Sequence, residues 1–532
     1  MVATRIGLTT ARVQDPAYVP TRSPYLALGR RRMERASCAV RTGVLSRVGG
    51  VKRILSAPDI DFAGIRTELG VDEEYGEDAL AEARATAELV ESDAPSADRY
   101  AEVREDHTGV PFVTIDPPTS RDLDQAVHIT ADGDGFVVDY AIADVAALIA
   151  PEGALDQESR RRGTTVYFPD GSVPLHPREL SEAAGSLLPE QVRLCVLWSI
   201  RVAGDGSVTD VRVRRSRIRS VARLDYAGVS ADAAAGRLHP SIAALPAFGE
   251  LRHEVALGRG AVELDLPDQT VVRTDGGWRL DLEAHTPADM WNSQVSLLAG
   301  MCAGTLMADA GVGLLRTLPP AEQDAVEDLR AAARALGAHW PDGVSVGRFL
   351  AGLPGDEPST LALQSAAGGL MRGANYLALT GSDEAETPDE PLMRHSAIGG
   401  LYAHVTAPLR RLGDRFATEV CLAITAGTPV PDWVQRALPT LPKILRSADT
   451  LGATADRASI DLAEAVILRE RVGERFDAVV MSAATERRPA QIFLSDPPVV
   501  ARSAGDLRPG DRAVVELTKA DEMSRTVEFR AV

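Results

Sequence analysis

The order of strand-like and helix-like segments constrains the fold of this 532-residue chain more than any other feature. Short runs of β-branched and apolar residues, separated by Gly and Asp turn signals, begin at Pro111 and predict a small sheet. From about residue 285 to 470 the chain is rich in alanine and predicts helices. Strand-like alternation returns over residues 476–532. This order predicts an α+β fold, with a mixed sheet surrounded by helices and a small β domain at the C-terminal end.

The same patterns place individual elements. Helices are expected to start near Met290, Ala321 and Pro408, and a further helix over residues 78–90 has Asp78 as a plausible N-cap. The C-terminal strands suit a closed barrel of the OB type, and a β-meander fits their pattern equally well. The predicted strands cover residues 112–115, 126–129 and 136–142 in the sheet and 477–481, 490–494, 513–517 and 526–529 in the C-terminal region.

Charge is distributed unevenly along the chain. The formal net charge is −19, yet residues 1–55 carry eleven Lys and Arg against two acidic residues. We interpret this segment as a flexible basic arm; an extension without a fold, or a segment resembling a transit peptide, fits as well. The rest of the chain is strongly acidic, so any binding of a polyanion requires a local basic channel or bound cations.

Other features indicate a soluble protein in a reducing cytoplasm. The longest charge-free stretch, residues 290–308, contains several polar residues and therefore predicts a buried helix rather than a membrane span. The chain has no apolar core of a secretory signal peptide. Its four cysteines are far apart and form no CxxC pair, which argues against a zinc site or a disulfide framework.

An acidic motif follows the first predicted strand. That strand ends at Asp116, a Pro-rich loop follows, and Asp122 and Asp124 enter the next strand on one face, with Leu123 on the opposite face. Carboxylates gathered in this way repel one another unless cations lie between them, and Mg²⁺ prefers oxygen ligands. A pair of such metals can stabilise in-line phosphoryl displacement. A solvated acidic turn and a structural calcium loop are the alternatives, although the motif lacks the Gly and Glu of an EF-hand loop.

A second motif reads Tyr402-Ala-His-Val-Thr406-Ala-Pro408-Leu-Arg410-Arg411-Leu-Gly-Asp-Arg-Phe and predicts a loop that runs into a helix. Thr406 is a plausible N-cap and Pro408 suits the first turn. Free N–H groups at a helix start, together with two arginines, would suit a phosphate. The alternative is a salt-bridged surface helix in which Arg410 pairs with Asp414.

The two motifs together resemble the catalytic signatures of the ribonuclease II family, which carries a central RNB domain. Ile-Ala-Asp-Val at 142–145, Tyr-Phe-Pro at 167–169 and Val-Pro-Leu-His-Pro-Arg-Glu-Leu-Ser at 173–181 resemble further family segments in the same order. The resemblance spans about residues 110–480. We therefore divide the chain into a basic flexible arm (1–57), a helical N-terminal segment (58–105), an RNB-like catalytic domain (106–474) and an S1/OB-like domain (475–532).

The resemblance implies roles for individual residues. Asp116, Asp122 and Asp124 would hold Mg²⁺ or Mn²⁺, with Asp124 closest to the chemistry. Where family members usually have a fourth Asp, this chain has Gln125, either a neutral metal ligand or a hydrogen-bond partner. The implied RNA contacts are Arg410 on the scissile phosphate, its neighbour Arg411, Tyr167 stacked on the terminal nucleotide, Tyr226 near the sugars, and Glu464. Asn292-Ser293-Gln294 replaces a segment in which many members have a Glu.

These expectations imply a metal-dependent 3′-to-5′ exoribonuclease that hydrolyses single-stranded RNA to 5′-mononucleotides. We expect a cytoplasmic monomer that binds single-stranded RNA and no membrane, and no protein partner can be inferred from the sequence. A catalytically inactive RNA-binding or regulatory protein on the same scaffold is the alternative, for which Gln125 and the acidic surface argue. A calcium-stabilised structural protein would leave Arg410, Arg411 and Tyr167 unexplained.

Overall fold

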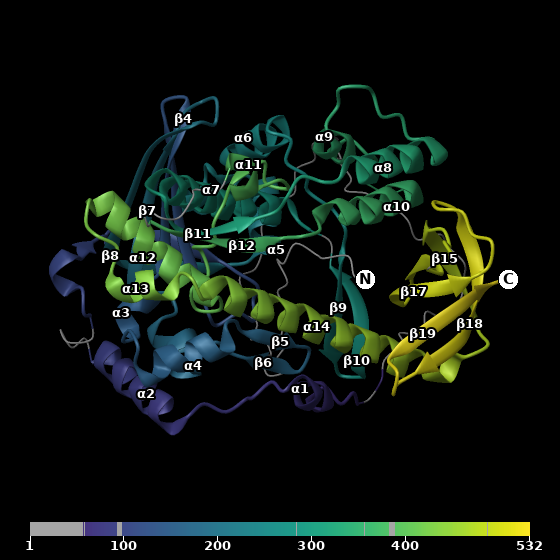
Figure 1. The fold of residues 1–532 in the computed structure, drawn as a ribbon, viewed down its shortest axis with the longest axis horizontal. Coiled ribbons are helices and arrows are strands. Elements are labelled where there is room, and N and C mark those ends of the chain that lie inside the picture. The colour runs from purple at the N-terminus through teal and green to yellow at the C-terminus, as the bar shows by residue number, and fades with distance from the viewer. Residues whose placement is uncertain are drawn as a thin grey trace, which may run out of the picture.

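The computed structural model describes residues 57, 59–92, 98–283, 285–355, 357–381, 389–486 and 488–532. The predicted basic arm lies outside these residues, except for Ala57, which forms an isolated β-bridge with Trp278. In Figure 1 a mixed sheet and its surrounding helices form the larger part of the molecule, and a β-barrel lies at one end. The predicted α+β class is confirmed.

The central sheet has six strands in the order β1-β8-β2-β3-β4-β7. The strand β8 also pairs with β7, so the strands β8, β2, β3, β4 and β7 form a closed ring of paired strands, and β1 lies outside that ring. The three predicted strands are present, whereas the two longest strands, β7 and β8, were not predicted. The bounds are β1 Glu105–Asp106, β2 Phe112–Ile115, β3 Gln125–Asp132, β4 Gly135–Ala143, β7 Val192–Val202 and β8 Val208–Leu224.

The hairpin between β3 and β4 shows how the sequence fixes the register. Gly133 in the turn has a φ of +64°, a conformation that glycine adopts at little cost. On the flanking strands Val127, Ile129 and Val138 are buried in the main core cluster. A shift by one residue would move these side chains to the opposite face, so the buried face holds the register in place.

Two helices, α7 and α12, supply much of the core that packs with this sheet. The helix predicted near Met290 is α7, which starts at Pro287 behind a capping box of Thr286 and Asp289. The helix predicted over residues 78–90 is α2, but its N-cap is Gly76, and Asp78 lies in its first turn. The helices are α1 Ala63–Leu69, α2 Glu77–Glu91, α3 Val145–Leu148, α4 Ala154–Arg162, α5 Tyr226–Ala234, α6 Leu245–Gly258, α7 Pro287–Ala310, α8 Gln323–Ala335, α9 Val346–Ala351, α10 Pro358–Ala367, α11 Glu390–Met393, α12 Leu412–Ala426, α13 Asp432–Ala437 and α14 Leu441–Leu468.

The C-terminal strands form a closed barrel in the order β15-β16-β17-β19-β18, so the barrel alternative is correct and the meander is wrong. The strand β17, which was not predicted, closes the barrel by pairing in parallel with β19. Figure 1 shows the 28-residue helix α14 running from the main body toward the barrel. The barrel strands are β15 Arg475–Ser482, β16 Ala490–Ser495, β17 Pro498–Ala504, β18 Arg512–Asp521 and β19 Thr526–Ala531.

Among the described residues, four two-stranded sheets complete the main body. They are β5 Val166–Phe168 with β6 Gly171–Val173, β9 Asp268–Thr274 with β10 Gly277–Glu283, β11 Val312–Thr317 with β12 Asn375–Thr380, and β13 Arg394–His395 with β14 Gly400–Leu401. In the part of the chain that the structure describes, no helix has the length and apolar character needed to cross a membrane.

Candidate active site

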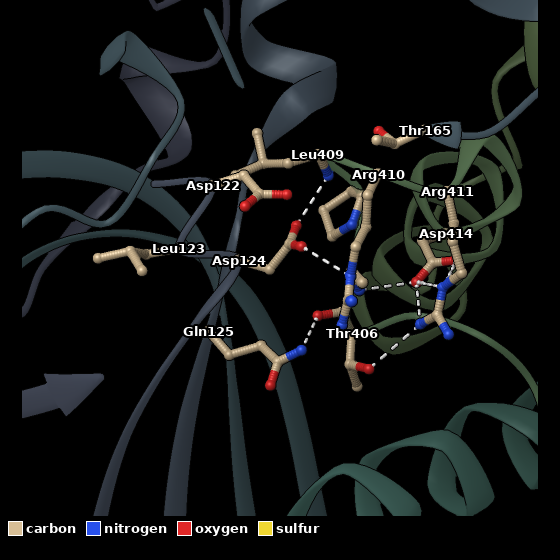
Figure 2. Close-up of polar contacts among 12 residues, drawn as sticks. Asp122, Leu123, Asp124, Gln125, Thr165, Thr406, Leu409, Arg410, Arg411 and Asp414 are labelled. Carbon is tan, nitrogen blue, oxygen red and sulfur yellow. Dashed lines mark hydrogen bonds and ion pairs between the residues drawn. The ribbon is translucent and has the colours of Figure 1, made fainter. Parts of the chain in front are cut away.

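The acidic motif lies between β2 and β3. Asp116 follows the last residue of β2, while Asp122 and Asp124 lie in the irregular segment just before β3 rather than within the strand. Leu123 is fully buried, as predicted, and Figure 2 shows its side chain pointing away from the two carboxylates that flank it. The alternation of side chains predicted for a strand therefore already holds in the residues that enter β3.

The second motif forms a loop, and the predicted helix start at Thr406 is wrong. The helix α12 begins at Leu412 with Arg411 as its N-cap residue. The reason is Asp414 in the first turn, whose carboxylate accepts a hydrogen bond from Ala407 N at 2.7 Å and holds the loop in a turn before the helix. The same carboxylate pairs with Arg411 at 2.7 Å. Arg410 therefore lies on the loop, and its predicted alternative partner Asp414 is taken by Arg411.

The loop meets the acidic motif at Asp124. The Asp124 carboxylate accepts a hydrogen bond from Leu409 N at 2.8 Å, although these residues lie 285 positions apart in the chain. Its second oxygen is 3.5 Å from Arg410 Nε, an ion pair longer than a good hydrogen bond. Figure 2 shows both contacts, with Asp122 beside them. The Arg410 side chain is 27% exposed and the Asp124 side chain only 4%. Arg410 therefore contacts the buried carboxylate and is itself partly exposed to solvent.

The carboxylates are only partly compensated. One oxygen of Asp116 is buried without a hydrogen-bond partner. Burial, with a contribution from the negative charge of Asp122, raises the pKa of Asp116 to about 7, although Arg410 and Arg223 oppose the change. Burial also raises the pKa of Asp124 well above its usual value. Asp122 accepts a bond from the Tyr167 hydroxyl at 3.3 Å. An additional cation would relieve this excess of buried negative charge.

These residues fit a divalent cation in part. The donors are carboxylate oxygens, which Mg²⁺ and Mn²⁺ prefer, and the unpartnered oxygen of Asp116 is a free acceptor. Both oxygens of Asp124 already have protein partners. Within the described ranges no three His, Cys, Asp or Glu side chains are grouped so that they could hold an ion without rearrangement. Asp116 and Asp122 are therefore the carboxylates best suited to hold a cation.

Gln125 does not face the carboxylates. Its Nε2 donates to the Thr406 carbonyl at 2.7 Å, and its Oε1 accepts from the Tyr140 hydroxyl at 2.6 Å. Both polar atoms of the amide are thus bonded to protein groups. Gln125 is thus a hydrogen-bond partner of Thr406 and Tyr140, and its role as a metal ligand stays a prediction.

The predicted RNA-binding tyrosines lie at this site. Tyr167, on β5, contacts Asp122, as described above. Tyr226 lies at the start of α5, and its hydroxyl accepts a hydrogen bond from Asn292 Nδ2 at 3.4 Å. Burial raises the pKa of Tyr226, and the negative charge of Asp116 adds to this rise. In the sequence Asn292 stood out only because it departs from the family pattern. No other signal marked its place beside Tyr226.

Glu464 is not part of this arrangement. It lies on α14, is buried, and accepts hydrogen bonds from Gln269 Nε2 at 2.7 Å and Val500 N at 3.4 Å. These partners belong to β9 and to the barrel strand β17. These bonds join α14 to β9 and β17, and the RNA contact implied for Glu464 stays a prediction.

Several contacts of the loop could not be found from the sequence. Thr165 N donates to the Arg410 carbonyl at 3.0 Å, and Leu409 bonds to Asp124 through its backbone N–H. Backbone groups carry no side-chain signature, so no residue pattern marks them. Tyr140 was placed on a strand, but a single tyrosine in an apolar strand does not reveal that its hydroxyl points at Gln125.

Comparison with known proteins agrees with this fold. The RNB domain family matches residues 104–423, and the RNase II-type exonuclease C-terminal S1 domain matches residues 474–532. The chain therefore belongs to the RNB domain family, as the resemblance implied.

The chain is similar to Exoribonuclease 2 of Vibrio cholerae serotype O1, with 30% identity over 344 residues, which is 59% of this chain and 47% of the relative. For Exoribonuclease 2 of Edwardsiella piscicida the identity is 32% over 349 residues, 61% of this chain and 51% of the relative. The chain thus spans about half the length of the curated relatives it matches.

Among solved structures, RNase R of Mycoplasma genitalium in complex with ribose methylated single-stranded RNA aligns with a TM-score of 0.76 at 17% identity, over 88% of this chain and 77% of the other. Yeast Ssd1, described as a pseudonuclease, aligns with a TM-score of 0.60 at 14% identity, over 78% and 52%. At these identities the two structures support the fold alone.

Proposed function

We propose that this chain is a metal-dependent 3′-to-5′ exoribonuclease that hydrolyses single-stranded RNA to 5′-mononucleotides. The observation that carries the proposal is the contact between Asp124 and Arg410, together with Asp116, one of whose carboxylate oxygens is buried without a hydrogen-bond partner. Membership of the RNB domain family and the similarity to proteins named Exoribonuclease 2 support it.

The residues of the site have distinct parts in this proposal. Arg410 is partly exposed and carries a guanidinium that can bind a phosphate with two hydrogen bonds. Its long ion pair with Asp124 leaves donors free for such a contact. Asp116 and Asp122, with Asp124, would hold Mg²⁺ or Mn²⁺, which supplies charge stabilisation to the attacking and leaving oxygens. Tyr167 would offer a ring for the terminal base.

A product ladder tests the proposal directly. Purified protein is incubated with 5′-labelled single-stranded RNA in Mg²⁺, in Mn²⁺ or in EDTA, and the products are resolved. We expect a descending ladder only with metal, and a 3′-labelled copy of the RNA should release its label as a mononucleotide from the first turnover. Release of long internal fragments, or the same ladder in EDTA, would contradict the proposal.

A second candidate is an RNA-binding protein without catalysis. Two observations favour it: Gln125 stands in place of a carboxylate, and Asp124 is already bonded to Leu409 and Arg410. The same experiment separates the two candidates. A shift in RNA mobility without a ladder in either metal would establish the binding protein instead of the enzyme.

A further inference from the structure

We propose that Gln125 is a positioning residue that fastens the loop carrying Arg410 to the start of β3. This inference rests on the proposed role of Arg410 as the phosphate contact. Asp124 and Gln125 are consecutive, and both side chains extend to one loop, where they hydrogen-bond to Leu409 and Thr406 (Figure 2).

The chemistry of the partners fixes the orientation of the Gln125 amide. A carbonyl can only accept, so the atom that faces Thr406 O at 2.7 Å must be the amide nitrogen. The amide oxygen then faces Tyr140, whose hydroxyl must donate across the 2.6 Å contact. Tyr140 therefore accepts from Ser296 Oγ, which lies 2.8 Å away. The result is a directed chain of hydrogen bonds from α7 through β4 and β3 to the loop.

Other backbone groups of the loop have hydrogen-bond partners that do not involve Gln125. Ala407 N donates to Asp414, and the Arg410 carbonyl accepts from Thr165 N at 3.0 Å. The Thr406 carbonyl depends on Gln125, and Thr406 is only 5% exposed. Loss of this bond would leave a buried acceptor unpaired, which is costly. The loop would then gain freedom at the end opposite to Asp124.

A carboxylate cannot replace this amide. An ionised Glu has the same length and can accept from Tyr140, but it has no hydrogen to give to Thr406 O and would face that carbonyl with like partial charge. An Asp is also shorter. The carboxylate that family members usually carry here would therefore loosen the loop in this chain, and it would not simply add a ligand for Mg²⁺.

The test uses Gln125→Glu and hydrogen exchange in the full-length protein, without RNA or metal. We expect the backbone amides of residues 407 and 409–411 to exchange roughly tenfold faster than in the wild type; residue 408 is a proline and has no amide hydrogen. In the presence of Mg²⁺, the single-turnover rate at saturating protein should fall by about tenfold to a hundredfold, because Arg410 is misplaced. The Mg²⁺ concentration for half-maximal rate should not decrease.

Two further variants make the result specific. Gln435→Glu, on α13, is a matched control. Gln435 Nε2 also donates to a backbone carbonyl, Val430 O at 2.8 Å, so this variant loses the same kind of donor. It should leave hydrogen exchange at residues 407–411 unchanged. Tyr140→Phe removes the partner that orients the Gln125 amide without any change of charge. It should increase exchange in the same loop, less than Gln125→Glu does, and it serves as the test if the Glu variant does not fold.

The outcomes are distinct. Unchanged exchange at residues 407–411 in the variants overturns the inference, as does a lower Mg²⁺ requirement in Gln125→Glu with the rate preserved, which would make residue 125 a metal ligand. A wild-type protein that does not cleave RNA in any metal contradicts the proposed function. The exchange measurement would still decide whether Gln125 holds the loop.

Discussion

Two groups of buried carboxylates and arginines border the central sheet, and they are balanced differently. Asp144 accepts from Arg104 Nη2 at 2.9 Å and from Arg215 Nη1 at 2.6 Å, and Arg215 also pairs with Glu419. Burial alone would raise the pKa of Asp144, but Arg215 and Arg104 hold it below its usual value. In the candidate site, burial instead raises the pKa of Asp116 to about 7, and one of its oxygens has no partner.

The two groups differ in whether the protein itself balances their charge. Around Asp144 every charge has an opposite charge within hydrogen-bond distance, so the group is satisfied without a ligand. Around Asp116 negative charge is in excess, which costs stability unless a cation or substrate compensates for it. Both groups contain family-like motifs, so their sequence signatures alone did not separate them. The comparison predicts that mutations in the Asp116 group change activity and that mutations in the Asp144 group change stability.

Asp124→Asn should give the largest effect. The change keeps the shape of the side chain and the bond from Leu409, but it removes one charge from the site. We expect the single-turnover rate of RNA cleavage to fall by about three to four orders of magnitude, because charge in the transition state loses its compensation. RNA affinity and the urea midpoint should change little. A variant that cleaves as fast as the wild type would remove Asp124 from the chemistry.

Asp144→Asn should act on stability instead. It leaves Arg104 and Arg215 buried with less compensation, and breaking such pairs costs about 3–5 kcal/mol. Asp210→Asn is the matched control, because Asp210 pairs with the exposed Arg212 on the same strand, where a surface pair contributes about 1 kcal/mol or less. Urea denaturation of the three proteins measures the difference. Similar midpoints for both variants would mean that the Asp144 group does not stabilise the fold.

Arg410 variants test whether the arginine acts on the reacting phosphate. Arg410→Ala should reduce the single-turnover rate by about a hundredfold, while affinity for RNA changes by less than about tenfold. Arg410→Lys retains the charge but not the planar fork and should recover only part of the rate. Arg436→Ala, which breaks an exposed pair with Glu152, is the control and should leave both quantities unchanged. Equal loss of affinity and rate in Arg410→Ala would indicate a role in binding alone.

The sequence predicted the parts of the molecule that side-chain pattern determines. The β3–β4 hairpin followed from its Gly and Asp turn and its buried alternation, and the burial of Leu123 followed from its neighbours. The long strand β7 was missed although it is a largely apolar run, whereas β8 was missed because it carries arginines, among them the buried Arg215, where an apolar run would be expected. A buried ion pair is a tertiary feature, so local polarity gives the wrong indication there.

At the site the sequence identified the two motifs but not how they meet. It placed Thr406 at a helix start because Thr and Pro favour that position, whereas the bond from Ala407 N to Asp414 moves the start to Leu412. The orientation of Gln125 depends on Tyr140 and on a carbonyl far along the chain, which no local pattern encodes. The placement of Glu464 likewise depends on how α14 meets the barrel.

Glu464 is an intermediate case that sharpens the comparison, because it is bonded to Gln269 and Val500 but has no cationic partner among those bonds. Burial raises its pKa from 4.5 to about 8. The folded protein therefore holds a proton that the unfolded chain releases above about pH 4.5, so this carboxyl makes stability decrease as pH rises toward 8.

Glu464→Gln tests this assignment outside the group formed by Asp116, Asp122 and Asp124. Gln cannot titrate and still accepts from Gln269, so the variant should show a flatter dependence of unfolding free energy on pH between about 4.5 and 8. Near pH 8.5 it should be more stable than the wild type by about 1–3 kcal/mol. Urea denaturation at pH 5, 7 and 8.5 gives the measurement, with the exposed Glu470→Gln as the control. If Glu464→Gln instead weakened RNA binding while its pH profile stayed that of the wild type, Glu464 would belong with Asp116 and Asp124 as a functional carboxylate. A raised pKa would then mark a functional carboxylate even where the protein supplies hydrogen bonds to it.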